Sequence, residues 1–316
     1  MTMFSRLVLC AALALTAPAT AAPRPAGREP INITFLGNAG WQISDGRVAI
    51  LVDPYLSEFR KDAPKDQLDT DDPIAEPDAA SIDAHVGKAD YILITHGHYD
   101  HMIDAPYIAK KTGAVIICHE SAANIARAYG VGALPQGAFD PRALHKLPLI
   151  VVRGGEDFQF ADFSLAVIPS LHTPLFDKRY NDGFWAGSTR PGLTAPLHES
   201  DYAEGGTFDY LLRVGGHQIF IMGSMNYIER EVAGLRPDIA IIGAGPSRLD
   251  IRDYTKRLMS ALGNPRTIFP SHWDDYGTKP RAVALKEVAT FVAEVHAASP
   301  HSTVIVPDYF TPMTFR

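Results

Sequence analysis

A histidine-rich segment at residues 91–101 constrains this chain more than any other feature. It begins with the short apolar run Tyr-Ile-Leu-Ile, which predicts a buried strand, and continues as Thr-His-Gly-His-Tyr-Asp-His. Open α/β sheets place their ligands in loops at the carboxyl ends of such strands. Residues two apart in an extended segment point the same way, so His96, His98 and Asp100 can converge, and a turn can then bring His101 alongside. Imidazole and carboxylate together suit zinc and similar borderline metals.

The size and charge of the chain narrow its class. Its 316 residues fit one large domain or two small ones, and no linker that would separate two domains follows residue 30. The net charge is −7, with 36 acidic against 29 basic residues and no run rich in Lys or Arg. We therefore expect a single globular domain that does not bind nucleic acid.

The N-terminus has the pattern of a secretory signal. Arg6 precedes the apolar run Leu7 to Leu15, and small residues follow as far as Ala21. We predict a cleaved signal peptide at residues 1–21, a mature domain at 22–316, and a periplasmic or secreted protein. The alternative of a membrane anchor is disfavoured because the run is too short to span a bilayer. No other long apolar stretch exists, so we expect no stable membrane insertion after cleavage.

The rest of the chain alternates between β-rich and mixed β/α regions, twice over. Asp45-Gly46 and Gly215-Gly216 each separate two apolar runs and predict two-residue hairpins. We expect residues 56–80 to form a long surface loop and residues 304–306 to form the last strand. Two similar β-then-α halves predict an α/β fold in which two sheets pack face to face with helices outside.

Three further polar loops each follow a predicted strand. Two of them carry His172 and His272, and the remaining one carries Ser224. With the histidine-rich segment, this arrangement resembles the metallo-β-lactamase superfamily, whose signature is His-x-His-x-Asp-His. The resemblance extends from Ile31 to about Ile305. It implies an αββα sandwich of two mixed β-sheets with helices on the outer faces, and one or two metal ions, usually Zn²⁺, at one edge.

The resemblance also implies a ligand set, residue by residue. The first metal would take His96, His98 and His172, and the second Asp100, His101 and His272. A water or hydroxide would lie between the ions, with its pKa lowered toward neutrality. Asp100 would also orient this nucleophile, and Mn²⁺ or Fe²⁺ are alternatives to zinc.

Ser224 marks a departure from the family pattern. Most members with two metals carry a bridging aspartate at this place, whereas serine is neutral and a weak ligand. We expect a weaker second site and a supporting, hydrogen-bonding role for Ser224 behind the ligands. The third subclass of metallo-β-lactamases is similar in lacking the bridging carboxylate.

The N-terminal half resembles a different branch of the superfamily. Residues 33–40 and 50–54 are similar to ascorbate-phosphate lactonases and N-acyl-phosphatidylethanolamine phospholipase D, although that branch usually has His where Asn38 stands. Tyr99 is shared with the phospholipase members and is a candidate proton donor; packing within the loop is the alternative. Residues 174–205, with their aromatic and basic side chains, line the pocket or form a lid, or are an ordinary surface insertion.

These observations predict an exported metal-dependent hydrolase. It would use a metal-bound hydroxide to cleave an ester, lactone or phosphodiester bond of a small molecule. One alternative is a β-lactam-hydrolysing enzyme with a dizinc site that lacks a bridging carboxylate. A second alternative is a mononuclear or non-catalytic metal-binding relative, and a third is an iron-dependent oxidoreductase of the persulfide-dioxygenase type. The sequence leaves the oligomeric state open.

Overall fold

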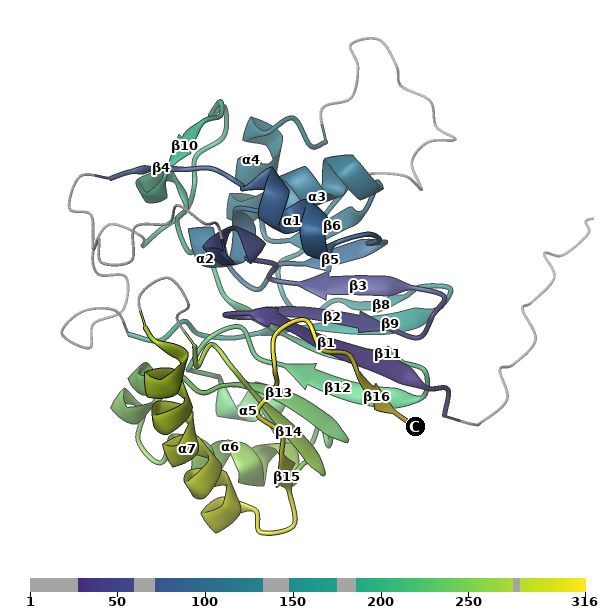
Figure 1. Cartoon of the computed structure of the whole chain (residues 1–316), viewed down its shortest axis with the longest axis vertical. Helices are drawn as coiled ribbons and strands as arrows, with labels where there is room; N and C mark the ends of the chain where they lie inside the picture. The colour runs from purple at the N-terminus through teal and green to yellow at the C-terminus, as the bar shows by residue number, and fades with distance from the viewer. Residues whose placement is uncertain (1–27, 60–71, 133–147, 175–185, 275–278) are drawn as a thin grey trace, which may run out of the picture.

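The computed structural model describes residues 28–59, 72–132, 148–174, 186–274 and 279–316. The predicted signal peptide, residues 1–21, lies outside these ranges. The described parts of the chain form two large β-sheets, with helices on the outer side of each (Figure 1). None of the described helices has the length and apolar character needed to cross a membrane. The predicted α/β sandwich is therefore confirmed.

The first sheet contains seven strands in the order β16-β1-β2-β3-β5-β6-β7. These strands are β16 (Met313–Phe315), β1 (Ile31–Gly37), β2 (Gly40–Ser44), β3 (Ala49–Val52), β5 (Tyr91–Leu93), β6 (Val115–Cys118) and β7 (Leu149–Val151). Pairing is antiparallel from β16 to β3 and parallel from β3 to β7. The loops that follow the parallel strands therefore gather at one edge of the sheet.

The second sheet repeats this plan in the order β15-β14-β13-β12-β11-β9-β8. Its strands are β15 (Thr303–Val304), β14 (Thr267–Ser271), β13 (Ile239–Gly243), β12 (His217–Ile221), β11 (Phe208–Val214), β9 (Phe163–Pro169) and β8 (Asp157–Gln159). Pairing is antiparallel from β8 to β12 and parallel from β12 to β15. The mixed character predicted for both sheets is confirmed.

The helices divide between the two sheets. Those between strands β3 and β7 of the first sheet are α1 (Ala79–His85), α2 (Tyr99–Met102), α3 (Ala105–Thr112) and α4 (Glu120–Ala128). Those following strands of the second sheet are α5 (Glu229–Val232), α6 (Tyr254–Leu262) and α7 (Arg281–Ala298). Short 3-10 turns lie at η1 (Leu56–Phe59), η3 (Glu199–Asp201) and η4 (Pro246–Asp250). Figure 1 shows α1, α3 and α4 on one side of the strands and α6 and α7 on the other.

Both faces of the central strands are buried, which explains their continuous apolar sequences. In the β5 segment, Leu93 packs into the core between the sheets, whereas Ile92 and Ile94 pack under the outer helices. This alternation follows from the two-residue period of a strand. The loop after β5 therefore starts from a strand that is fixed on both faces.

Two of the predicted turns have different outcomes. The Gly215-Gly216 hairpin is confirmed, since Val214 pairs with His217 across two glycines of positive φ. The Asp45-Gly46 hairpin is confirmed as a hairpin, but its loop has four residues instead of two because β3 begins at Ala49. Asp45 explains the longer loop, because its Oδ1 accepts hydrogen bonds from the backbone N–H groups of Arg47 and Val48.

Two other expectations are wrong. The chain does not end its last strand at 304–306, because β15 ends at Val304 and β16 follows at the C-terminus, where Phe315 pairs with Ile31. The segment 56–80 is not loop throughout, since η1, β4 (Ile74–Ala75) and the start of α1 lie within it. β4 pairs with β10 (Leu197–His198), so a distant partner defines it. Residues 60–71 lie outside the described ranges.

Candidate metal centre

The six predicted ligands gather at the carboxyl ends of strands from both sheets. They are His96, His98, Asp100, His101, His172 and His272. The first four lie in the loop after β5 and in α2, whereas the other two lie in the loops after β9 and β14. They form two groups of three, and within each group the potential ligand atoms all lie within 4.8 Å of one another.

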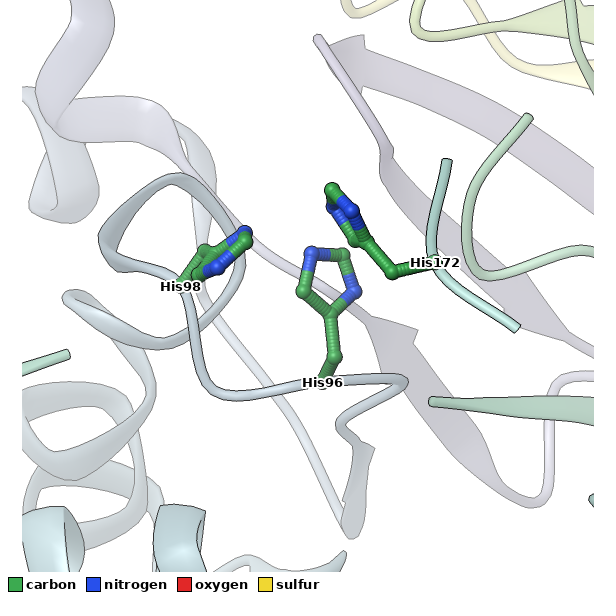
Figure 2. A group of neighbouring side chains, drawn as sticks. All are labelled: His96, His98 and His172. Atoms are coloured by element: carbon green, nitrogen blue, oxygen red, sulfur yellow. The ribbon is translucent and has the colours of Figure 1, made fainter. Parts of the chain in front are cut away.

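The first group, His96, His98 and His172, consists only of imidazoles. The three rings face one another (Figure 2), with ring centroids 4.7, 4.8 and 4.7 Å apart. The Nε2 atom of His96 is buried and has no hydrogen-bond partner. A buried polar atom without a partner loses the solvation it has in water, so His96 Nε2 is suited to bind a ligand.

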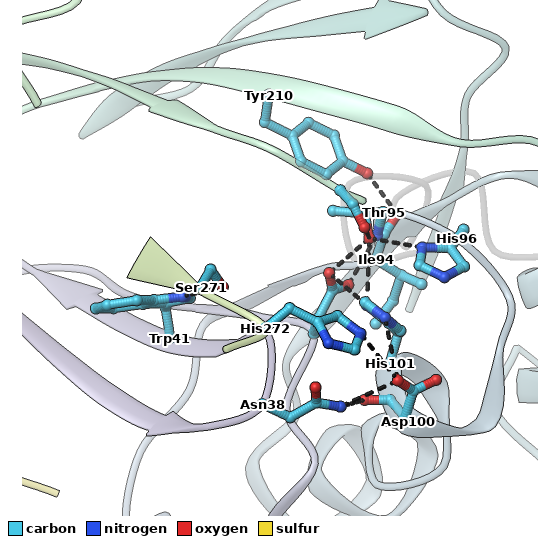
Figure 3. A network of polar contacts seen from close by, with 12 residues as sticks. Asn38, Trp41, Ile94, Thr95, His96, Asp100, His101, Tyr210, Ser271 and His272 are labelled. Atoms are coloured by element: carbon cyan, nitrogen blue, oxygen red, sulfur yellow. Dashed lines mark hydrogen bonds and ion pairs between the residues drawn. The ribbon is translucent and has the colours of Figure 1, made fainter. Parts of the chain in front are cut away.

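The second group, Asp100, His101 and His272, includes a carboxylate. Asp100 Oδ2 lies 3.2 Å from His272 Nε2 and 3.5 Å from His101 Nε2 (Figure 3). The Nε2 atom of His101 is buried and makes no hydrogen bond. Histidine and carboxylate side chains from two distant chain segments thus meet at one point.

The two groups differ in their protonation. Burial, followed by the charge of neighbouring histidines, lowers the pKa of His96 well below its usual value and that of His172 to about 3. In the second group, burial opposes ionisation, but His101 and His272 hold the pKa of Asp100 well below its usual range. Burial also opposes the charged form of His101, but Asp100 and Asp53 raise its pKa. His96 and His172 are therefore neutral, whereas in the second group the ionised form of Asp100 and the protonated form of His101 stabilise each other.

Asp53, for which the sequence predicted no role, follows β3 directly and supports the histidines from behind. Its Oδ2 lies 2.9 Å from His101 Nδ1 and accepts the Thr95 hydroxyl at 2.5 Å, and its Oδ1 accepts the Thr95 N–H at 2.8 Å. Thr95 Oγ1 in turn lies 3.1 Å from His96 Nδ1. Because the Thr95 hydrogen points to Asp53, His96 Nδ1 must donate to Thr95. One buried carboxylate thus orients two histidines.

The loop that carries His172 is held by a second network. His172 Nδ1 donates to the Thr173 carbonyl at 2.8 Å, and the Thr173 N–H donates to Ser224 Oγ at 3.2 Å. Asp209 accepts from the Gly223 N–H and from Ser170 Oγ, both at 2.9 Å. Asp209 therefore ties the loop after β9 to the loop after β12. Ser224 is in neither group of ligand atoms.

Gly97 is required by the packing of the histidine-rich loop. A Cβ atom at this position would lie 2.2 Å from the Ala203 carbonyl oxygen, and the Gly97 N–H donates to the Glu204 carbonyl at 2.9 Å. Residues 186–205 of the predicted lid are also hydrogen-bonded to helix α4, since the Thr189 N–H donates to Ser121 Oγ at 2.7 Å. This part of the segment forms a fixed wall beside the loop. Residues 175–185 lie outside the described ranges.

Tyr99, the predicted proton donor, lies at the start of α2. Its ring meets the ring of Tyr55 edge-on, with centroids 6.0 Å apart, and packs against the core under the outer helices. These are packing contacts, so the catalytic role of Tyr99 stays a prediction.

The chain is similar to one family model and to proteins named metal-dependent hydrolases. The family model described as "Beta-lactamase superfamily domain" matches residues 32–272. The UPF0173 metal-dependent hydrolase of Heliobacterium modesticaldum is 27% identical over 298 residues, which cover 87% of this chain and 97% of that protein.

Two solved structures have a similar fold. The metallo hydrolase Igni18 from the archaeon Ignicoccus hospitalis has a TM-score of 0.54 at 16% identity, over 91% of this chain and 99% of that chain. An isothiocyanate hydrolase from Delia radicum gut bacteria has a TM-score of 0.55 at 17% identity, over 90% of this chain and 99% of that chain.

Proposed function

We propose, from the premise that this chain belongs to the metallo-β-lactamase superfamily of metal-dependent hydrolases, that it cleaves an ester, lactone or phosphodiester bond in a small molecule. The observation that carries this proposal is the pair of three-residue groups, each with its potential ligand atoms within 4.8 Å. The choice of bond rests on the sequence of the N-terminal half, which resembles lactonases and phosphodiesterases.

We assign one metal ion to each group. His96, His98 and His172 would hold the first, and Asp100, His101 and His272 the second. Nitrogen and carboxylate ligands favour zinc over harder cations such as Mg²⁺ or Ca²⁺. When bound, such ions supply Lewis acidity and a water nucleophile that is active near neutral pH.

The tautomers of the histidines support this assignment. His96 donates from Nδ1 to the Thr95 hydroxyl, His172 donates from Nδ1 to the Thr173 carbonyl, and His101 donates from Nδ1 to Asp53. Each ring therefore directs its Nδ1 hydrogen away from the centre, and its Nε2 faces inward. Metal-binding histidines are commonly fixed in this way by the partner of the second ring nitrogen.

Asp100 and Tyr99 would take different roles in proton transfer. Asp100 is held ionised beside His101 and His272, so it can accept a hydrogen bond from the attacking water and orient it. Tyr99 follows His98 directly and is our candidate for protonating the leaving group.

Metal analysis of the purified protein, combined with a panel of esters, lactones, phosphodiesters and β-lactams, tests this function. We expect bound zinc and turnover of at least one ester, lactone or phosphodiester, both lost after chelation and restored by Zn²⁺. Turnover of β-lactams alone would replace the proposed substrate class. A protein fully loaded with metal that hydrolyses no member of the panel would overturn the proposal in favour of a non-catalytic metal-binding role.

A further inference from the structure

Asn38 lies in the turn between β1 and β2 and directs its side chain toward Asp100 (Figure 3). Its Nδ2 donates to Asp100 Oδ2 at 3.0 Å and to the Asp100 backbone carbonyl at 3.3 Å. Both partners are acceptors, so the amide nitrogen with its two hydrogens must face them. Asn38 is buried, with 5% of its surface exposed, and its contacts with Asp100 are partly buried.

The backbone of Asn38 contacts the opposite sheet. Its carbonyl accepts the His272 N–H at 2.8 Å, and its own N–H donates to Asp274 Oδ2 at 3.2 Å. His272 has a φ of +54° and Asn38 a φ of +49°, a region that asparagine tolerates better than most residues. Asn38 thus holds the backbone from which the His272 side chain extends.

These contacts link Asn38, Asp100 and His272 in a closed ring of interactions. Asn38 binds Asp100 through its side chain, Asp100 contacts His272 Nε2 at 3.2 Å, and the His272 N–H returns to Asn38. Asp100 belongs to a loop of the first sheet, whereas His272 follows a strand of the second. Ser224 provides no carboxylate that would join the two sides. Asn38 therefore supplies a connection between them.

We propose that Asn38 is a positioning residue that holds Asp100 and His272 at the separation needed by a second divalent cation. The inference rests on the proposed metal assignment of these residues. As a neutral donor, the amide fixes the carboxylate without cancelling its charge, so Asp100 remains a strong ligand for a cation. A residue that orients a ligand in this way typically contributes roughly 10- to 100-fold to metal affinity.

Titration of metal-free full-length protein with Zn²⁺, followed by calorimetry, tests the proposal. Asn38→Gly keeps the left-handed backbone and removes only the side chain. We expect the second equivalent of Zn²⁺ to bind roughly 10- to 100-fold more weakly, while the first is unchanged. Asn264→Gly is the matched control because Asn264 also has a positive φ, of 58°, and lies at the end of α6, away from both groups. It should leave both equivalents unchanged.

Asn38→Asp tests whether the side chain acts as a hydrogen-bond donor to Asp100 or as a ligand of the metal ion. It keeps the shape of the side chain but replaces the two donor hydrogens with an acceptor, so the second equivalent should weaken at least as much as in Asn38→Gly. Affinity equal to or above that of the parent would overturn the positioning role, because the side chain would then act as a ligand. An equal loss of both equivalents in Asn38→Gly would overturn it as well.

The outcome is separable from that of the proposed function. A parent protein that binds one equivalent of Zn²⁺ and hydrolyses a substrate would overturn the role of Asn38 and leave the hydrolase assignment in place. A parent that binds two equivalents, with the second sensitive to Asn38→Gly, but hydrolyses nothing would support the positioning role and remove the proposed reaction.

Discussion

The two candidate metal groups are assembled in the same way but differ in charge. Each takes two residues from the segment after β5 in the first sheet and one from a loop of the second sheet. In the tri-histidine group of His96, His98 and His172, the rings of His96 and His172 are neutral and are oriented by a hydroxyl and a carbonyl. The group of Asp100, His101 and His272 contains a carboxylate and lies against a second one, Asp53.

This difference bears on the order in which metals bind. A cation entering the tri-histidine group meets the buried Nε2 of His96, which makes no hydrogen bond, and the neutral imidazoles of His96 and His172. A cation entering the other group must replace the ion pair between Asp100 and His101 and release its proton. We therefore expect the tri-histidine group to fill first. The absence of a bridging carboxylate at Ser224 should also weaken the second site. This is an independent reason to expect the tri-histidine group to fill first.

The largest effect should come from removing a ligand of the tri-histidine group. His98→Ala should reduce hydrolysis on the order of a thousandfold, because several kcal/mol of Lewis-acid stabilisation are lost with the first metal. His272→Ala should lose the second equivalent of Zn²⁺ and keep the first. Both are measured by metal analysis and by kcat/KM on the best substrate of the panel.

His301→Ala is the control for these two variants because His301 is an exposed histidine outside both groups. It should leave metal content and turnover unchanged. If His98→Ala and His272→Ala each lost both equivalents, the two groups would behave as a single site, and the proposed order of filling would be wrong.

Gly97→Ala should disturb both groups at once, because Gly97 lies in the loop that they share. The added Cβ would lie 2.2 Å from the Ala203 carbonyl, so the loop must move away from the wall at residues 186–205. We expect a loss of about 1–3 kcal/mol in the free energy of unfolding, measured with denaturant. Gly87→Ala is the control, since a Cβ there meets no atom within 4 Å. If Gly97→Ala kept full stability and full metal content, residues 186–205 would be able to move aside at little cost in free energy.

The fold and the clustering of the candidate ligands could be predicted because their signals are local. The spacing of His96, His98, Asp100 and His101 within one segment, directly after an apolar strand, already defines most of both groups. The two remaining histidines follow strands that are recognisable from their own composition. The resemblance to a known family then linked these distant segments.

Ser224 could be predicted as a supporting residue, but the role of Asp53 could not be predicted because it depends on distant partners. Asp53 acquires its role only when β3 pairs with β5 and brings it to Thr95 and His101. Strand β16 has three residues and exists only because β1 lies beside it. An aspartate at the end of a strand and three residues near a terminus carry no distinctive local pattern.

Asp209 provides a test that depends on pH, because it ties together two loops of the second sheet only. Burial, which outweighs the hydrogen bonds from Gly223 and Ser170, raises its pKa to about 7. The folded protein then keeps a proton that the unfolded chain has lost between pH 3.8 and about 7. Stability from this group is present below that window and decreases as the pH rises through it, by up to about 1.4 kcal/mol per pH unit.

Asp209→Asn should remove this dependence. The difference in unfolding free energy between parent and variant should change across the window and become constant above it, as measured by urea denaturation at several pH values. Gln159→Ala, at an exposed position that does not ionise, should give a curve parallel to that of the parent. A constant difference between parent and Asp209→Asn at every pH would contradict the prediction.

The smallest effect should come from Ser224→Ala, and it should fall on the tri-histidine group. The variant removes the acceptor of the Thr173 N–H, beside His172, and leaves that buried donor without its partner. A loss of about 1 kcal/mol corresponds to roughly fivefold weaker binding of the first equivalent of Zn²⁺. Calorimetric titration measures this change, and Ser260→Ala, at an exposed position on α6, is the control.

The same titration shows which residue supports each group in the absence of a bridging carboxylate at Ser224. If Ser224 acts only through Thr173 and His172, the second equivalent is unaffected in Ser224→Ala, whereas Asn38→Gly weakens the second and spares the first. Each group then has its own support, one through Ser224 and the other through Asn38. Weakening of the second equivalent in Ser224→Ala would instead mean that the serine contacts the second ion, as a bridging ligand does, and the two groups would then share a support.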